Sequence, residues 1–98
     1  RVSSRDELVL GEEIEALAAH RGARYVVVDG HRIPGRDSWL PESAAHLGDA
    51  EALLQIAPDI ADHDVYICGS GPWMAAAEAA VKDAGAARKA IHIEHFEY

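Results

Sequence analysis

The residues best suited to hold a ligand are Cys68–Trp73, Cys-Gly-Ser-Gly-Pro-Trp, at the end of the apolar run Val65–Cys68. The run predicts a short buried strand. Gly69 and Gly71 allow a sharp turn and a close approach to the backbone, and Pro72 fits the first turn of a helix. In open α/β sheets, ligands bind at the carboxyl ends of strands, where such a turn offers backbone N–H donors. From spacing alone, a glycine turn that only reverses the chain explains the stretch equally well.

Three segments share the order and spacing of a known set of motifs. Cys68–Met74 reads Cys-Gly-Ser-Gly-Pro-Trp-Met, Ala57–Tyr66 reads Ala-Pro-Asp-Ile-Ala-Asp-His-Asp-Val-Tyr, and Ile91–Phe96 reads Ile-His-Ile-Glu-His-Phe. They resemble the Cys-Gly-Pro-x-x-Met, Val-Pro-Asp-Ile-x-x-x-Asp-Val-Tyr and Ile-His-x-Glu-x-Phe motifs of the NAD(P)H-binding domain in the ferredoxin–NADP reductase superfamily. The resemblance is closest to bacterial ferric-reductase-like FAD/NAD(P)-binding oxidoreductases. It covers residues 57–96, and residues 1–29 fit the layout more loosely.

The resemblance implies roles for individual residues. Cys68 would lie beside the nicotinamide and face the flavin, for packing and polarity rather than nucleophilic attack. Glu94 and Phe96 would lie near the isoalloxazine ring, as a carboxylate that organises polar contacts and an aromatic that stacks on the flavin. The same pocket would be lined by Gly69, Ser70, Gly71, Pro72 and Trp73. The alternatives are a buried apolar cysteine, an ordinary edge strand, core packing by Trp73, and stacking by Tyr98 instead.

The first residues could contact the nucleotide's other end. They include two arginines and two serines, namely Arg1, Ser3, Ser4 and Arg5. The resemblance places them at the end of the second strand of the domain, beside the adenosine ribose or its 2′-phosphate. Guanidinium and hydroxyl groups suit a phosphate dianion, which slightly favours NADPH over NADH. A solvated terminus with helix-capping serines is the alternative.

The two histidines and the glutamate near the carboxyl terminus could also suggest a metal site. His92 and Glu94 point to one face of the predicted strand, whereas His95 points to the other. Two ligands on one face are too few for a structural zinc site, so we expect no metal.

Composition limits the possible partners. The chain has 98 residues, a net charge of −8 and one cysteine. The negative charge argues against a nucleic-acid or anionic-membrane surface. One cysteine excludes an internal disulfide, which suits a reducing compartment. No apolar run approaches the ~18–20 residues of a membrane span. Because the chain begins with Arg1, we expect part of a longer cytoplasmic protein, or the cytoplasmic part of a membrane protein that carries a haem domain.

Helices and strands should alternate to position these residues. The patterns predict helices over Glu12–Arg21, Asp49–Ile56 and Pro72–Ala84, strands over Arg24–Asp29, Val65–Cys68 and Ala90–Phe96, and a surface loop over Gly30–Pro41. Tyr25–Val28 lacks alternation, which indicates a strand covered on both faces and hence a parallel sheet. We therefore predict an α/β fold with three αβα layers, a Rossmann-like nucleotide-binding module.

Each predicted helix has an apolar face that should point inward. The faces consist of Ile14, Leu17 and Ala18; of Leu53, Leu54 and Ala57; and of Trp73, Met74, Ala77, Val81 and Ala84. Asp49 should cap its helix and Gly85 should end the last one. Glu78 and Lys82 should pair on the wet side of that helix. Trp39 should hold the irregular loop in place.

One part of the resembled domain is missing. Such a domain opens with a central strand and a Gly-Gly-x-Gly-x-Thr-type turn, which nothing in this chain matches. We therefore expect residues 1–98 to be a partial NAD(P)-binding domain. Its sheet should be a depleted one of three strands, with a gap that a partner or a tag fills.

The resemblance implies a flavoprotein reductase. The parent protein would pass a hydride from NADPH or NADH to FAD, held mainly by a domain outside this chain, and then electrons to a metal or redox partner. We expect no turnover by the 98 residues alone. The alternative is a non-catalytic α/β interaction module, which the missing glycine-rich turn favours. A response-regulator-like receiver would need an acidic cluster and a later lysine, and only Asp29 fits.

Overall fold

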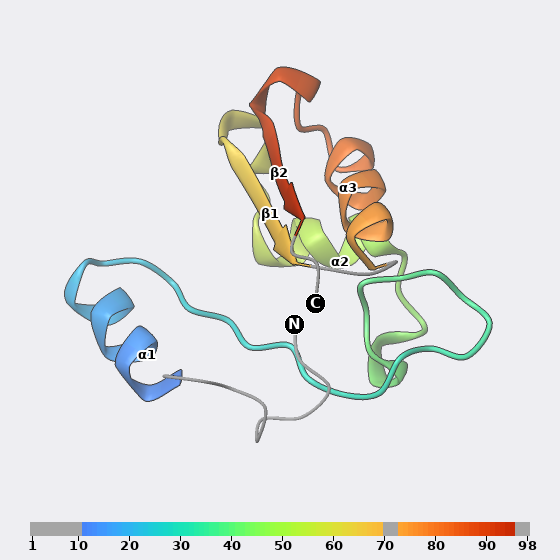
Figure 1. Ribbon diagram of the computed structural model, residues 1–98, viewed down its shortest axis with the longest axis horizontal. Coiled ribbons are helices and arrows are strands. Elements are labelled where there is room, and N and C mark those ends of the chain that lie inside the picture. Colours follow the sequence, from blue (N-terminus) through green and yellow to red (C-terminus); the bar gives the residue numbers. More distant parts are fainter. Residues whose placement is uncertain (1–10, 70–72, 96–98) are drawn as a thin grey trace.

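Two parallel strands, β1 (Val65–Gly69) and β2 (Ile91–His95), form the sheet of the computed structural model, which describes residues 11–69 and 73–95 (Figure 1). Three α-helices accompany them in the described residues: α1 (Gly11–His20), α2 (Asp49–Ile56) and α3 (Trp73–Asp83). Short 3-10 turns occupy Glu42–Ala44, Ile60–Asp62 and Arg88–Ala90. Predicted site residues that lie outside the described ranges are Arg1, Ser3, Ser4, Arg5, Ser70, Gly71, Pro72 and Phe96.

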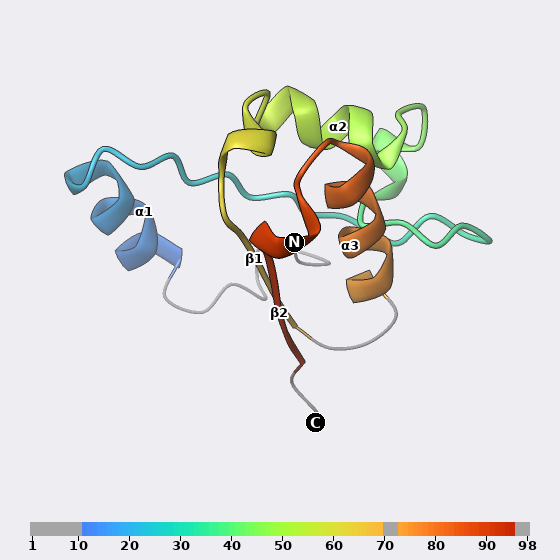
Figure 2. The same cartoon turned by 90° about the horizontal axis from the view of Figure 1, so that it is seen from above.

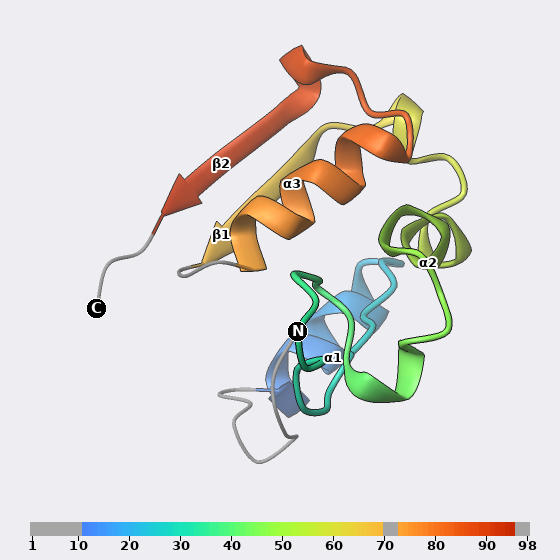
Figure 3. The ribbon, with the colours of Figure 1, turned by 90° about the vertical axis from the view of Figure 1, so that its right-hand side faces the viewer.

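The sheet has the connection that parallel pairing requires. Parallel neighbours cannot be joined by a tight hairpin, so the chain crosses over between them. Helix α3 makes this crossover and packs against β1, while α2 packs against α3 (Figure 3). The described part is therefore an α/β fold in which α3 packs on the sheet and α2 packs on α3. The predicted third layer stays a prediction.

The core lies between β1, α3 and α2. The predicted inner face of α3 is confirmed, because Met74, Ala77 and Val81 are buried, and Trp73 and Ala84 pack at the margin of the core. Ala80 is also buried. The expected salt bridge on the outer side of α3 forms, with Lys82 Nζ 3.0 Å from Glu78 Oε1.

The two later helices end close to the predicted residues, but the predicted cap of α2 does not form. At the end of α3, Gly85 adopts a φ of 110°, and the N–H of Ala86 donates to the carbonyl of Val81. Helix α2 has the predicted bounds, but Asp49 does not cap it: the N-cap position is Gly48, with no side-chain hydrogen bond. The inner face predicted for α2 is partly wrong, because Leu54 is 38% exposed while Ala52 is buried.

The amino-terminal part differs most from expectation. Helix α1 spans nearly the predicted residues, but it stands apart from the sheet and from α2 and α3 (Figures 1 and 2). Its supposed inner face is open, with Leu17 55% exposed and Ile14 44%. Among residues 11–69 and 73–95, no other helix or strand packs against this face to bury it.

The strand predicted over Arg24–Asp29 is also wrong in the described structure. Residues 24–28 form no ladder, so the sheet has two described strands instead of three. The valine run supplies β propensity, but a strand also needs a neighbour for its N–H and C=O groups. No described strand pairs with this segment, and the side chain of Val26 remains 53% exposed.

Candidate functional site

The carboxyl ends of the two strands bring together two predicted site residues. Cys68 is directly opposite Glu94 in the parallel register, and Gly69 is opposite His95. Neighbouring strands are about 4.8 Å apart, and paired residues point to the same face of a sheet. The side chains of Cys68 and Glu94 are both exposed. They therefore lie side by side at the sheet end where ligands of α/β folds bind.

The same open face carries an aromatic pair further down the strands. Tyr66 stacks on His92 with ring centroids 4.6 Å apart, two residues before Cys68 and Glu94 respectively. Asp64 Oδ1 lies 3.3 Å from His92 Nε2. In the described residues no helix covers this pair, and Tyr66 is 71% exposed. The pair therefore places two exposed aromatic rings on the same face as Cys68 and Glu94.

The glycine after Cys68 is required by packing. A Cβ atom at Gly69 would lie 2.5 Å from Cζ2 of Trp73. The indole therefore covers the backbone at the end of β1, and only glycine leaves room for it. Trp73 also packs against the core, so the core-packing alternative for this residue is supported.

A polar cavity adjoins Trp73. Its volume is about 230 Å³, and its lining includes Arg32, Gly35 and Ser38 of the irregular loop. The Arg32 guanidinium makes no hydrogen bond or ion pair with any described residue. Asp37 also lines the cavity, so its lining carries both signs of charge. The volume suits a group the size of a phosphate rather than a whole dinucleotide, because ligand pockets run from ~300 to 1,000 Å³. Sequence reasoning treated this loop as surface and missed it. The signal was the pair of arginines with Ser38 in a segment rich in glycine and proline.

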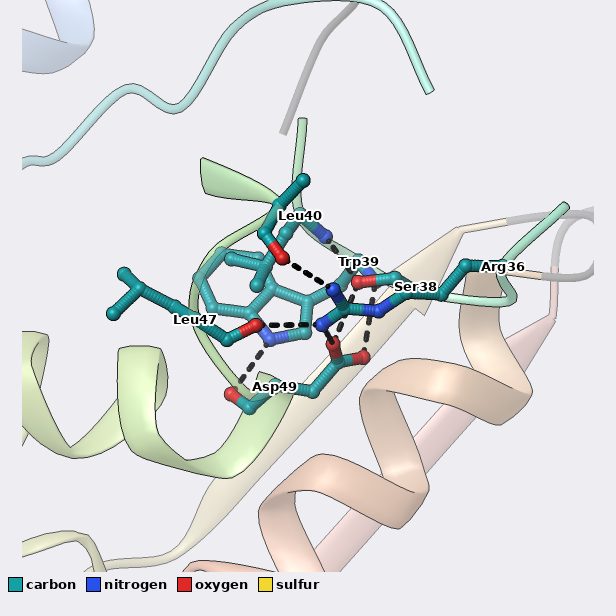
Figure 4. A network of polar contacts seen from close by, with 7 residues as sticks. Arg36, Ser38, Trp39, Leu40, Leu47 and Asp49 are labelled. Atoms are coloured by element: carbon teal, nitrogen blue, oxygen red, sulfur yellow. Dashed lines mark hydrogen bonds and ion pairs between the residues drawn. The ribbon is translucent and has the colours of Figure 1, made fainter. Parts of the chain in front are cut away.

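The loop is held by one network around Asp49 (Figure 4). Arg36 donates to the carbonyls of Ala45 and Leu47, at 2.9 and 2.7 Å, and to Asp49 Oδ1 at 2.8 Å. Ser38 Oγ donates to the same carboxylate oxygen at 2.6 Å. These bonds explain why Asp49 does not cap α2, since its side chain is turned back to the loop.

Trp39 completes the network. Its indole Nε1–H donates to the backbone carbonyl of Asp49 at 3.0 Å, and the residue is only 8% exposed. The prediction that Trp39 holds the loop is confirmed. Because Arg36 is committed to structural acceptors, Arg32 is the arginine of this loop that remains available to a ligand.

The titratable pair with shifted pKa values lies at the opposite end of the sheet. His63 Nε2 is 2.9 Å from Asp59 Oδ2, just before the start of β1. This hydrogen bond raises the pKa of His63 and lowers that of Asp59. The whole length of β1 separates this pair from the carboxyl ends of the strands, so the pair does not act on a ligand bound there.

Two further findings concern the described residues only. No three His, Cys, Asp or Glu side chains gather there as a metal-ion site would require. None of the described helices combines the length and apolar character needed to cross a bilayer.

Comparison with known proteins finds ferredoxin reductase components. The chain is 35% identical over 97 residues to the ferredoxin reductase component of 3-ketosteroid-9-alpha-monooxygenase from Mycolicibacterium smegmatis, covering 97% of the chain and 25% of that protein. It is 32% identical over 96 residues to the same component from Rhodococcus rhodochrous, covering 96% of the chain and 24% of that protein. The Mycobacterium tuberculosis component is 32% identical over 97 residues.

The chain spans about a quarter of the length of these curated relatives. No protein-family model matches it, and no solved structure does. The similarity extends over nearly the whole of this chain.

Proposed function

We propose that residues 1–98 are the NAD(P)H-binding part of a flavin-dependent oxidoreductase. The observation that carries the proposal is the pairing of Cys68 with Glu94 at the carboxyl end of a parallel sheet. Its second support is similarity along nearly the whole chain to ferredoxin reductase components. In the complete protein, a hydride passes from NADPH or NADH to FAD.

The described residues fit a nicotinamide nucleotide. The exposed strand ends offer a flat, open position beside Cys68, and Glu94 supplies an anion next to it. The cavity beside Trp73 offers Arg32, a cation suited to phosphate. One part of the site thus suits an uncharged ring and the other a negatively charged group, as a dinucleotide requires.

Each site residue has a separate task in this proposal. The Glu94 carboxylate would lie beside the nicotinamide ring, where its negative charge would favour loss of hydride from that ring. Cys68, small and polarizable, packs against the ring without the steric demand of a larger side chain. The indole of Trp73 covers the backbone of Gly69. This contact would hold the end of β1 in one position relative to the nicotinamide ring. Phe96 would supply the aromatic ring that stacks on the flavin.

The complete protein supplies the remaining parts. FAD is held mainly by a domain outside these residues, and the acceptor is a ferredoxin-type or oxygenase partner, as the names of the relatives suggest. The comparisons lend no support to a membrane haem domain. Arg1, Ser3, Ser4 and Arg5 contact the adenosine end, together with Arg32.

The proposal is tested by anaerobic mixing of the full-length protein with NADPH and, separately, with NADH. Flavin absorbance should bleach within seconds, and it should bleach more slowly in a Glu94→Gln variant. In the isolated chain, NMR shifts on titration with NADPH should concentrate at Cys68–Met74 and at Arg32. A full-length protein that holds FAD but shows no bleaching with either nucleotide would contradict the proposal and favour a non-catalytic module.

A further inference from the structure

Strand β2 has one edge without a partner strand among residues 11–69 and 73–95. Figure 3 shows β2 on the outer side of the molecule, with β1 and α3 on its inner side. Helix α3 packs mainly on β1, so it leaves this edge of β2 open. The backbone N–H and C=O groups along such an edge can pair with a further strand.

The face of β2 on the helix side carries an apolar side chain that is not fully buried. Ile93 is opposite Ile67 in the parallel register, so both side chains point to the same face of the sheet. Ile67 is buried in the core, whereas Ile93 is 38% exposed. An apolar side chain brought alongside Ile93 by a neighbouring strand would bury this surface.

Two polar residues with complementary chemistry flank Ile93 on β2. His92 and Glu94 point to the open face of the sheet, and both are exposed. When two copies of β2 pair antiparallel about Ile93, His92 of each copy lies opposite Glu94 of the other. Cross-strand pairs of opposite charge stabilise a sheet, and a neutral imidazole can also donate a hydrogen bond to a carboxylate. The edge of β2 is therefore complementary to itself.

The side chains favour this register over its neighbours. Pairing centred on Glu94 would place two carboxylates directly opposite each other, which destabilises a sheet. Pairing centred on His92 would place two imidazoles opposite each other and leave Glu94 facing Ala90. Of these three registers, the one centred on Ile93 pairs His92 with Glu94.

We infer that β2 pairs antiparallel with β2 of a second copy of this chain, in the register centred on Ile93. The result is a four-stranded sheet in the order β1-β2-β2-β1, which is more stable than two strands alone. A two-fold axis relates the copies, so each contact between His92 and Glu94 occurs twice. The two Ile93 side chains cover each other on the helix side of the sheet.

The second copy adds a residue to the candidate site. Glu94 lies opposite Cys68 of its own chain, and in the dimer His92 of the second copy lies beside it as well. The stack on Tyr66 holds the ring of His92 from the β1 side. Pairing depends on the strand edge and not on a nucleotide, so failure of the function proposed above would leave this inference standing.

Light scattering of the full-length protein tests the inference. Two short strands make a small contact, so we expect a dimer that dissociates at roughly 10–100 µM. His92→Glu places like charges opposite each other at both contacts and should weaken the dimer at least about tenfold. Adding Glu94→His to that variant restores opposite partners and should recover most of the affinity. The inference is overturned by a protein that stays monomeric well above this range, by a dimer that His92→Glu leaves unchanged, or by a double variant as weak as His92→Glu alone.

Disulfide cross-linking locates the contact independently of the charges. Residues directly opposite in an antiparallel pair have Cβ atoms about 4.5–5.5 Å apart, near the reach of a disulfide. In full-length Ile93→Cys, oxidation by copper phenanthroline should give a linked dimer at least about tenfold faster than in Ala79→Cys, whose added thiol lies on the exposed side of α3. The parent protein gives the background from other cysteines. Equal rates in the two variants would place any dimer contact elsewhere and overturn the inference.

Discussion

The indole ring of Trp73 lies against Gly69 so closely that a Cβ atom at Gly69 would be 2.5 Å from the ring carbon Cζ2. This contact joins the last residue of β1 to the first residue of α3, across the turn on which the candidate site is built. The contact between the end of β1 and the start of α3 therefore requires a glycine, which leaves room for the ring.

Replacing Gly69 by alanine should destabilise the protein by about 2–4 kcal/mol, because the ring must shift and the backbone has a positive φ of 156°. Gly85→Ala is the control, since that glycine also has a positive φ but its Cβ would meet only Ala61, at 3.7 Å. It should cost about 1–2 kcal/mol. Urea unfolding measures both, and equal losses would mean that the Trp73 contact adds nothing.

Removing the carboxylate of Asp49 should loosen the loop beside the polar cavity. Asp49→Ala leaves Arg36 and Ser38 without a shared acceptor, and we expect a loss of about 1–3 kcal/mol in the free energy of unfolding. Glu78→Ala, which breaks an exposed ion pair on α3, should cost only about 0.3–0.5 kcal/mol. If Asp49→Ala costs no more than this control, the network does not stabilise the fold.

The stability contribution of the His63–Asp59 pair should depend on pH in a defined window. The hydrogen bond raises the pKa of His63 above 6.5, so its contribution is complete below 6.5 and is lost as pH rises through the raised value. It lowers the pKa of Asp59 below 3.8, so that contribution is present above 3.8 and is lost as pH falls through the lowered value. The pair should therefore stabilise between these limits.

NMR titration of the His63 ring measures this effect directly. The pKa of His63 should fall towards 6.5 in Asp59→Asn, and it should also fall in high salt because both groups are exposed. A titration curve that is the same in the parent chain and in Asp59→Asn would show that the hydrogen bond does not persist in solution.

Substituting Cys68 should affect hydride transfer more than folding. The side chain is exposed at the strand end, so Cys68→Ala should change the unfolding free energy by under about 1 kcal/mol. In the full-length protein, we expect flavin reduction by NAD(P)H to slow about tenfold or more, because the ring loses a packing partner. Cys68→Ser, which keeps size and polarity, should recover part of the rate. Transient-state absorbance at saturating nucleotide separates this loss from weaker binding.

Local sequence signals predicted the carboxyl-terminal half well. Each of these signals depends on only a few neighbouring residues. They are the apolar run before Gly69, the helical spacing of Met74, Ala77 and Val81, and the helix-ending glycine Gly85. Their positions in the structure agree with the expectation. The parallel register of Cys68 and Glu94 then follows from where two correctly predicted strands end.

Prediction failed where a segment depends on a distant neighbour. Tyr25–Val28 has strand-like residues, yet nothing described lies alongside to complete a ladder. Helix α1 has an apolar face that includes Leu17, and no described residues cover that face. Asp49 was predicted to cap α2, but it is the first residue of the helix, and its carboxylate binds Arg36, 13 residues away in the sequence. Helix-capping preferences are local, so they do not take into account a hydrogen bond from a residue this distant in the sequence.

The register between β1 and β2 also has a consequence for how the chemistry at the sheet end can change. The separation of Cys68 and Glu94 is set by main-chain pairing, to which their side chains contribute nothing. Either residue can therefore be exchanged for another reactive group while the second keeps its place. A slip of the pairing by one residue, in contrast, would move the Glu94 carboxylate to the opposite face of the sheet, away from the Cys68 thiol.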